Sequence, residues 1–197
     1  MPKILPDIQN TILTIAEKHF KDHGFEKTDM REIALESNIA VGTVYLHFHN
    51  KEALYQQVIK NNWTKTLEKI SAIAQTPDNP ETLLEEILDV LVKEMSNRKS
   101  HESLWMEIGS FHHHEFAKKP PMDHFSGMRD PITSILSDLT QKMATQDGKQ
   151  MDESIGSQLG SFAFIMTVDL CMQGSVPTGQ QTQLIRHLLA SYINQLT

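Results

Sequence analysis

The chain has 197 residues, of which 39% are hydrophobic and 22% charged, with a formal net charge of −7 at pH 7. This length suits one compact domain or two small ones that share a helix, and the composition is that of a soluble globular protein. The negative charge argues against nonspecific coating of nucleic acid. Cys171 is the only cysteine, which excludes an intrachain disulfide and a cysteine-based zinc site and suits a reducing cytoplasm.

The N-terminal segment resembles neither a signal peptide nor a transit peptide. No stretch approaches the roughly 20 apolar residues that a membrane helix needs. We therefore expect a cytoplasmic protein that does not associate with a membrane.

The first predicted helix runs from about Asp7 to His23, because apolar residues recur at spacings of three and four. Gly24 follows as a natural left-handed C-cap, and Phe25 can fold back on the last turn. His19 and His23 are four residues apart, a spacing that could bind a metal. Solvated histidines favoured by the helix dipole are the more common reading of this position.

Two short helices joined by a tight turn are predicted next. Asp29 is a good N-cap with Glu32 three residues later, a capping box. Asn38 tolerates a left-handed turn and ends the first helix. The second helix runs from about Val41 to Phe48, and such a pair is a helix-turn-helix, whose second helix can lie in the DNA major groove.

The rest of the chain is also predicted to be helical, and no strand-like alternation appears, so the fold class is all-α with about nine helices. The helix that begins at Asn50 is about 37 Å long at 1.5 Å per residue, longer than one small domain needs. The predicted helices after the turn span about 50–75, 80–96, 101–116, 130–146, 151–174 and 180–196.

One stretch closely resembles a known family. Ile33-Ala34, then Val41-Gly42-Thr43-Val44-Tyr45-Leu46-His47-Phe48, then Asn50-Lys51-Glu52-Ala53-Leu54 is similar to the N-terminal domain of the TetR/AcrR family of transcriptional repressors. The resemblance runs without gaps from about residue 8 to residue 55. It implies a three-helix DNA-binding domain over residues 6–66, with the helix-turn-helix at about 29–48, and an effector-binding and dimerisation domain over residues 67–197.

In this family the helix that begins at Val41 is the recognition helix. The resemblance implies that the following residues lie at the DNA: Thr28, Arg31, Ala40, Val41, Gly42, Thr43, Tyr45, His47 and Lys51. The sequence departs from the family at Ile39-Ala40-Val41, where polar residues are common. Apolar side chains there could pack on thymine methyl groups, so we expect some A·T content in the operator.

The resemblance also implies a small effector, bound by the second domain. Aromatic and methionine side chains can line an adaptable apolar pocket, although most of them are expected to be ordinary core. Candidate pocket residues for an apolar or aromatic ligand are Trp63, Leu67, Trp105, Met106, Phe111, Phe125, Met128, Phe162 and Met166.

Two-fold operators require two recognition helices about 34 Å apart, so the working unit is expected to be a homodimer. We expect its interface on the last two helices. Gly156 and Gly160, four residues apart, offer a surface on which another helix could approach closely. The interface candidates are Gly156, Gly160, Ala163, Leu184, Leu188 and Tyr192.

Other classes of function have weaker support. His112 and Glu115, with His124, could hold a metal or haem, although a polar helix end is the more common reading, so no cofactor and no metal are expected. Neither a Gly-rich phosphate loop nor the usual catalytic motifs are present, so an enzyme is not expected. An all-α protein-interaction module that only resembles the DNA-binding fold is a second alternative.

Overall fold

A computed structural model describes residues 7–96, 122–173 and 178–196. These residues form eight helices and contain no strand, so the all-α prediction is confirmed. The predicted helix over 101–116 lies outside the described residues. The helices are α1 (Ile8–Lys27), α2 (Met30–Glu36), α3 (Val41–His47), α4 (Lys51–Ala74), α5 (Pro80–Ser96), α7 (Met122–Gln146), α8 (Glu153–Gln173) and α9 (Thr178–Asn194).

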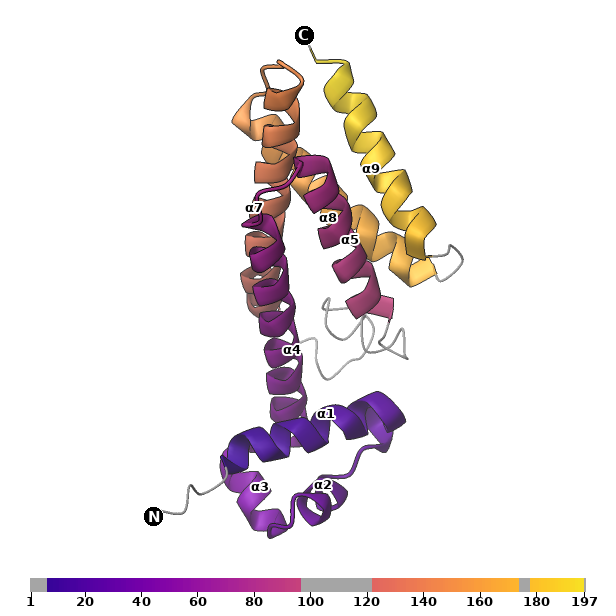
Figure 1. The fold of residues 1–197 in the computed structure, drawn as a ribbon. Coiled ribbons are helices and arrows are strands. Elements are labelled where there is room, and N and C mark those ends of the chain that lie inside the picture. Colours follow the sequence, from indigo (N-terminus) through magenta and orange to yellow (C-terminus); the bar gives the residue numbers. More distant parts are fainter. Residues whose placement is uncertain (1–6, 97–121, 174–177, 197) are drawn as a thin grey trace. The chain divides into compact units, whose positions relative to one another are not determined.

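Within the described residues the chain divides into two compact units (Figure 1). The N-terminal unit ends at Trp63 and comprises α1, α2, α3 and the first half of α4. The C-terminal unit begins at Thr64 and comprises the second half of α4 together with α5, α7, α8 and α9. Helix α4 therefore belongs to both units.

The core of the N-terminal unit collects apolar side chains from all four of its helices. Ile12 on α1, Ile33 on α2, Val44 on α3 and Leu54 on α4 are completely buried. Beside them the Tyr55 ring meets the edge of another aromatic ring of the cluster, that of Phe20 on α1, at 4.9 Å between ring centroids. Removing this apolar surface from water is what fixes the positions of the two short helices.

The ends of these helices follow the signals in the sequence. The Asp7 side chain accepts a hydrogen bond from the Asn10 amide and caps α1. Gly24 has a φ of 79° and interrupts the regular helix after His23, as predicted, and residues 25–27 form a separate turn that completes α1. Asn38 has a φ of 54° and ends the turn after α2, as predicted.

In the C-terminal unit, α5 buries one whole face against its neighbours. It packs against α7, α8 and α9, and its apolar stripe, including Leu84, Ile87 and Leu91, is completely buried. Ion pairs join its polar face to neighbouring helices: Lys69 of α4 lies 2.7 Å from Glu94, and Arg186 of α9 lies 3.4 Å from Glu85.

Helix α7 begins earlier than the sequence predicted. Asp130-Pro131 was expected to start the helix, but α7 begins at Met122 and carries Pro131 inside it. A proline inside a helix removes one backbone donor and crowds the preceding turn, at a cost of about 3 kcal/mol, but α7 continues through Pro131. Close to Pro131, the Thr133 hydroxyl donates to the Asp130 carbonyl at 3.0 Å.

Helix α8 corrects the expectation that no stretch of the chain is long and apolar enough for a membrane helix. Its segment Glu153–Cys171 has a mean hydropathy of 1.2 and is, by length and composition alone, long and apolar enough to cross a membrane. In the structure this helix packs against α5, α7 and α9, and Ala163 and Phe164 are buried within the unit.

Candidate nucleic-acid interface

Helix α3 is attached to its unit by one face only. Val44 is completely buried and Phe48, which caps the helix, is 5% exposed. Outside this face the side chains are open to solvent, with Val41 37%, Tyr45 46% and Leu46 82% exposed. The helix therefore presents side chains outward from a fixed position.

The preceding helix is fixed in the same way. The Asp29 carboxylate accepts a hydrogen bond from the Arg31 amide at 2.8 Å and starts α2. Ile33 and Ala34 are buried, whereas Arg31 is exposed. The Ile39 amide donates to the Ala34 carbonyl at 3.1 Å, which closes the turn between α2 and α3.

Six of the nine residues predicted to contact DNA lie on the exposed surface of this unit: Arg31, Ala40, Val41, Gly42, Tyr45 and His47. Thr43 and Lys51 are half-buried, and Thr28 is buried. A Cβ atom added to Gly42 would meet no atom within 4 Å, so the backbone of α3 is accessible from outside at this position.

Thr28 does not occupy the position that the resemblance implied. Its side chain is 3% exposed, and its hydroxyl donates to the Gly24 carbonyl at 2.7 Å. A hydroxyl that is buried and already bonded is not available to a phosphate oxygen. Thr28 instead stabilises the connection between α1 and α2, which corrects the prediction.

Lys51 has partners inside the protein as well. Its ammonium donates to the carbonyls of Glu26 and Thr28, at 3.1 and 3.2 Å, and lies 4.6 Å from the centre of the Phe25 ring. An ammonium has three N–H donors, so one remains for a phosphate. Besides the predicted phosphate contact, Lys51 therefore has a structural role, because its internal contacts join the start of α4 to the end of α1.

One side-chain cluster was missed by sequence reasoning. His19 is 8% exposed, and its Nε2 lies 2.7 Å from a carboxylate oxygen of Glu36 on α2. The other oxygen of Glu36 accepts from the Lys18 ammonium at 2.7 Å. These contacts hold the Glu36 carboxyl pKa below its ordinary value of 4.5, and they fasten α2 to α1. A solvated His19 was the expected reading, and that reading is wrong.

The predicted effector pocket is not assembled by the residues that the structure describes. Trp63 is 4% exposed and belongs to the N-terminal unit, whereas Leu67 and Met166 are half-buried in the C-terminal unit. Phe162 is 39% exposed. The remaining side chains lie outside the described residues: Trp105, Met106, Phe111, Phe125 and Met128.

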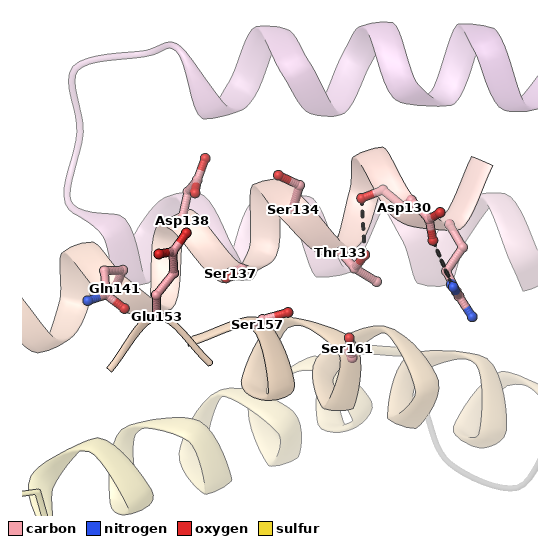
Figure 2. Close-up of a pocket in the computed structure, with 10 residues that line it drawn as sticks. Asp130, Thr133, Ser134, Ser137, Asp138, Gln141, Glu153, Ser157 and Ser161 are labelled. Carbon is pink, nitrogen blue, oxygen red and sulfur yellow. Dashed lines mark hydrogen bonds and ion pairs between the residues drawn. The ribbon is translucent and has the colours of Figure 1, made fainter. Parts of the chain in front are cut away.

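The C-terminal unit instead has a polar groove of about 710 Å³ between α7 and α8 (Figure 2). Its lining includes Ser137 and Asp138 from α7 and Ser157 from α8, and none of the predicted pocket residues. At one end Arg129 and Asp130 form an ion pair at 2.8 Å. This groove has the chemistry of a hydrated surface rather than that of an apolar ligand site.

The close helix approach predicted at Gly156 and Gly160 occurs within the chain. A Cβ atom at Gly160 would lie 2.6 Å from both the Ser137 amide nitrogen and the Thr133 carbonyl oxygen of α7. Gly156 is buried, and Ala163 is 0% exposed. Residues buried inside one chain cannot contact a second copy. Gly156, Gly160 and Ala163 are therefore removed from the predicted dimer interface.

The other three interface candidates are exposed. Leu184, Leu188 and Tyr192, at successive intervals of four residues on α9, are 44%, 41% and 44% exposed. Two apolar residues of α8, Phe162 and Ile165, are 39% and 60% exposed. A spacing of three residues places Phe162 and Ile165 on one face of α8. This pattern is visible in the sequence and could have added them to the interface candidates.

The side chains of the alternative metal site, His112, Glu115 and His124, lie outside the described residues. Among the side chains that are described, no group of three or more His, Cys, Asp or Glu residues is placed to hold a metal ion.

The short second helix, anchored through Val44, gives the N-terminal unit the geometry of a helix-turn-helix. Residues 12–58 match the family model described as bacterial regulatory proteins, tetR family. This N-terminal segment is therefore similar to the DNA-binding domains of TetR-family transcriptional regulators.

Individual comparisons agree with this assignment. An uncharacterized HTH-type transcriptional regulator of Bacillus subtilis (strain 168), YuxN, is 31% identical over 102 residues, which are 52% of this chain and 35% of YuxN. The chain spans about a third to a half of the length of the curated relatives that it matches, and these relatives are named as regulators rather than as enzymes.

Solved structures of the same fold cover nearly the whole chain. A TetR transcription regulator from Haloarcula marismortui superposes with a TM-score of 0.71 at 16% identity, over 98% of this chain and 99% of that one. The regulator FadR from Bacillus subtilis, solved in complex with stearoyl-CoA, superposes with a TM-score of 0.64 at 15% identity, over 92% and 97%. At these identities the likeness concerns the fold alone.

Proposed function

We propose that the protein is a cytoplasmic, homodimeric repressor that binds a two-fold operator through α3 and is released from it by a small apolar or aromatic effector. The observation that carries the proposal is the outward face of α3, whose side chains are exposed while Val44 and Phe48 hold the helix in place. The first 60 residues carry seven Lys and Arg and eight Asp and Glu. Binding must therefore rest on the placement of a few groups rather than on bulk attraction.

The DNA-binding step is tested by fluorescence anisotropy on DNA from upstream of the gene, against scrambled DNA, over a salt series. We expect a saturable preference for the upstream fragment that weakens as salt rises. Tyr45→Ala should weaken this binding by about tenfold, which corresponds to about 1.4 kcal/mol. Gln56→Ala, at an exposed position on α4, is the control.

The outcome separates the candidate functions. If Tyr45→Ala unfolds the protein or dissociates the dimer, Tyr45 is a core residue rather than a DNA contact. If no genomic fragment is preferred over scrambled DNA, the all-α interaction module replaces the repressor.

The dimer interface in this proposal is the exposed apolar surface of α8 and α9. Apolar side chains at intervals of four on one helix face form a stripe, and burying such a stripe against a second copy is favourable. Leu188→Asp should turn the dimer into a monomer in sedimentation equilibrium and abolish tight operator binding. His187→Asp, at the neighbouring exposed position, should leave both unchanged. A dimeric Leu188→Asp protein would place the interface elsewhere.

The effector step rests on the family and on one neighbour of the same fold. FadR of Bacillus subtilis was solved with stearoyl-CoA, so a long-chain acyl-CoA is one ligand of the apolar class to try first. An effector releases DNA only to the extent that it binds the DNA-free state more tightly. Helix α4 belongs to both units, and we propose that it carries the change from the effector site to the DNA-binding domain.

This step is tested by adding stearoyl-CoA, or coenzyme A without the acyl chain, to the protein–operator complex. Release by the acylated compound alone supports an apolar effector. Release by neither compound, together with a metal or haem found in the purified protein, would favour a sensor that uses the region from His112 to His124.

A further inference from the structure

We propose that Leu46 contacts the methyl group of a thymine in each half of the operator and so selects a T·A base pair there. The inference rests on the proposed function and goes beyond it, because it assigns a specificity-determining residue that the family resemblance did not mark. Leu46 is 82% exposed, more than Val41 or Tyr45 on the same helix.

The position of Leu46 on α3 places it at the centre of the outward face. Successive residues of a helix are about 100° apart, so Leu46 lies about 160° around the axis from Val44, the completely buried residue. Gly42 lies only about 40° from Leu46 on the same face. With no atom within 4 Å of a Cβ added at Gly42, this face can approach another molecule closely.

The chemistry of the major groove then limits what Leu46 can recognise. A leucine side chain has neither a donor nor an acceptor, so it cannot read the hydrogen-bonding edges of the bases. The apolar group that the base pairs present in the major groove is the C5-methyl of thymine. Contact between the two removes both from water, which favours thymine over a base without the methyl group.

A second leucine of the same unit provides a matched control. Leu35 is also 82% exposed, but it lies on α2, four residues after Arg31. In a helix-turn-helix the first helix crosses the DNA backbone while the second lies in the major groove, so Leu35 is not expected to reach a base edge. The two positions have the same side chain and the same exposure, and they differ in the helix that carries them.

The experiment begins with an operator selected from randomised DNA by the purified full-length chain. Each thymine of a half-site is then replaced by uracil, in both halves at once, which removes the methyl group and leaves base pairing intact. At one thymine position, this replacement should weaken binding of the wild-type protein about fourfold per half-site. Fourfold corresponds to about 0.8 kcal/mol, the free energy of burying one group of methylene size. Leu46→Ala should bind the thymine and uracil forms equally at that position, whereas Leu35→Ala should respond as the wild type does.

The results distinguish a failure of the proposed function from a failure of the Leu46 assignment. Selection of no preferred sequence refutes the proposed function. Selection of a clear operator, with uracil replacement affecting the wild type and Leu46→Ala equally at every position, leaves the regulator intact and overturns the assignment of Leu46. A loss of methyl sensitivity in Leu35→Ala and not in Leu46→Ala also overturns it. Thermal unfolding by circular dichroism establishes that the three proteins are folded.

Discussion

Three glycines in helices provide a graded test of the structure, because each replacement by alanine gives the same gain in helix propensity, about 1 kcal/mol. They differ in what the new methyl group would meet. At Gly42 it meets nothing within 4 Å, at Gly156 it meets the end of the Gln141 side chain at 2.8 Å, and at Gly160 it meets backbone atoms of α7 at 2.6 Å.

Gly160→Ala should destabilise the protein. Ordinary carbon contacts are about 3.5 Å or longer, and the backbone of α7 cannot rotate away as a side chain can, so α7 and α8 must separate. Overpacking of this kind costs about 1 to 3 kcal/mol. After the gain in propensity, we expect a net loss of up to about 2 kcal/mol, or a fall in Tm of up to about 8 °C for a chain of this size.

The other two variants complete the series, measured by urea and thermal unfolding followed by circular dichroism. Gly42→Ala should raise the free energy of unfolding by up to about 1 kcal/mol. Gly156→Ala should be nearly neutral, because Gln141 can move but then weakens its hydrogen bond to the Met151 carbonyl, which is 2.6 Å long. Equal stabilisation by Gly160→Ala and Gly42→Ala would refute the close approach of α7 and α8.

Three further predictions concern single side chains. Lys18, with a neighbouring histidine, holds the pKa of Glu36 below 4.5, so Glu36→Gln should be less stable than wild type at neutral pH. That difference should disappear as the pH falls through the depressed pKa in urea unfolding, and a constant difference would contradict the ion pair. Lys51→Ala should lower the free energy of unfolding by about 1 to 2 kcal/mol, because it loses two carbonyl partners and an aromatic contact; an unchanged value would contradict these contacts. Burial raises the pKa of the Cys171 thiol, so a disulfide reagent at about pH 8 should react faster after unfolding in urea than before it; equal rates would contradict the burial.

Much of the N-terminal unit could be predicted from local signals in the sequence. The caps at Asp7 and Asp29, the positive φ at Gly24 and Asn38 and the burial of Val44 each follow from a few neighbouring residues. The motif that resembles the family lies in this part of the chain, so the class of protein could also be predicted from the sequence.

The errors arose where the outcome depends on a distant part of the chain. Thr28 was assigned to phosphate, but its hydroxyl is bonded inside the unit, and only the folded backbone reveals that. His19 is separated from its partner Glu36 by 17 residues. The face of Gly160 meets α7 of the same chain rather than a second copy, a choice that periodicity on one helix does not determine.

The one-sided attachment of α3 affects the thermodynamics of DNA recognition. Within its seven residues only Val44 is buried, whereas α1 buries five residues, among them Ile12 and Phe20. Local opening is easiest where few apolar contacts are lost, so we expect the amides of α3 to exchange with solvent before those of α1. DNA binding suppresses this local opening of α3, which adds an unfavourable conformational entropy to binding. Operator affinity then depends on temperature as well as on which bases are present.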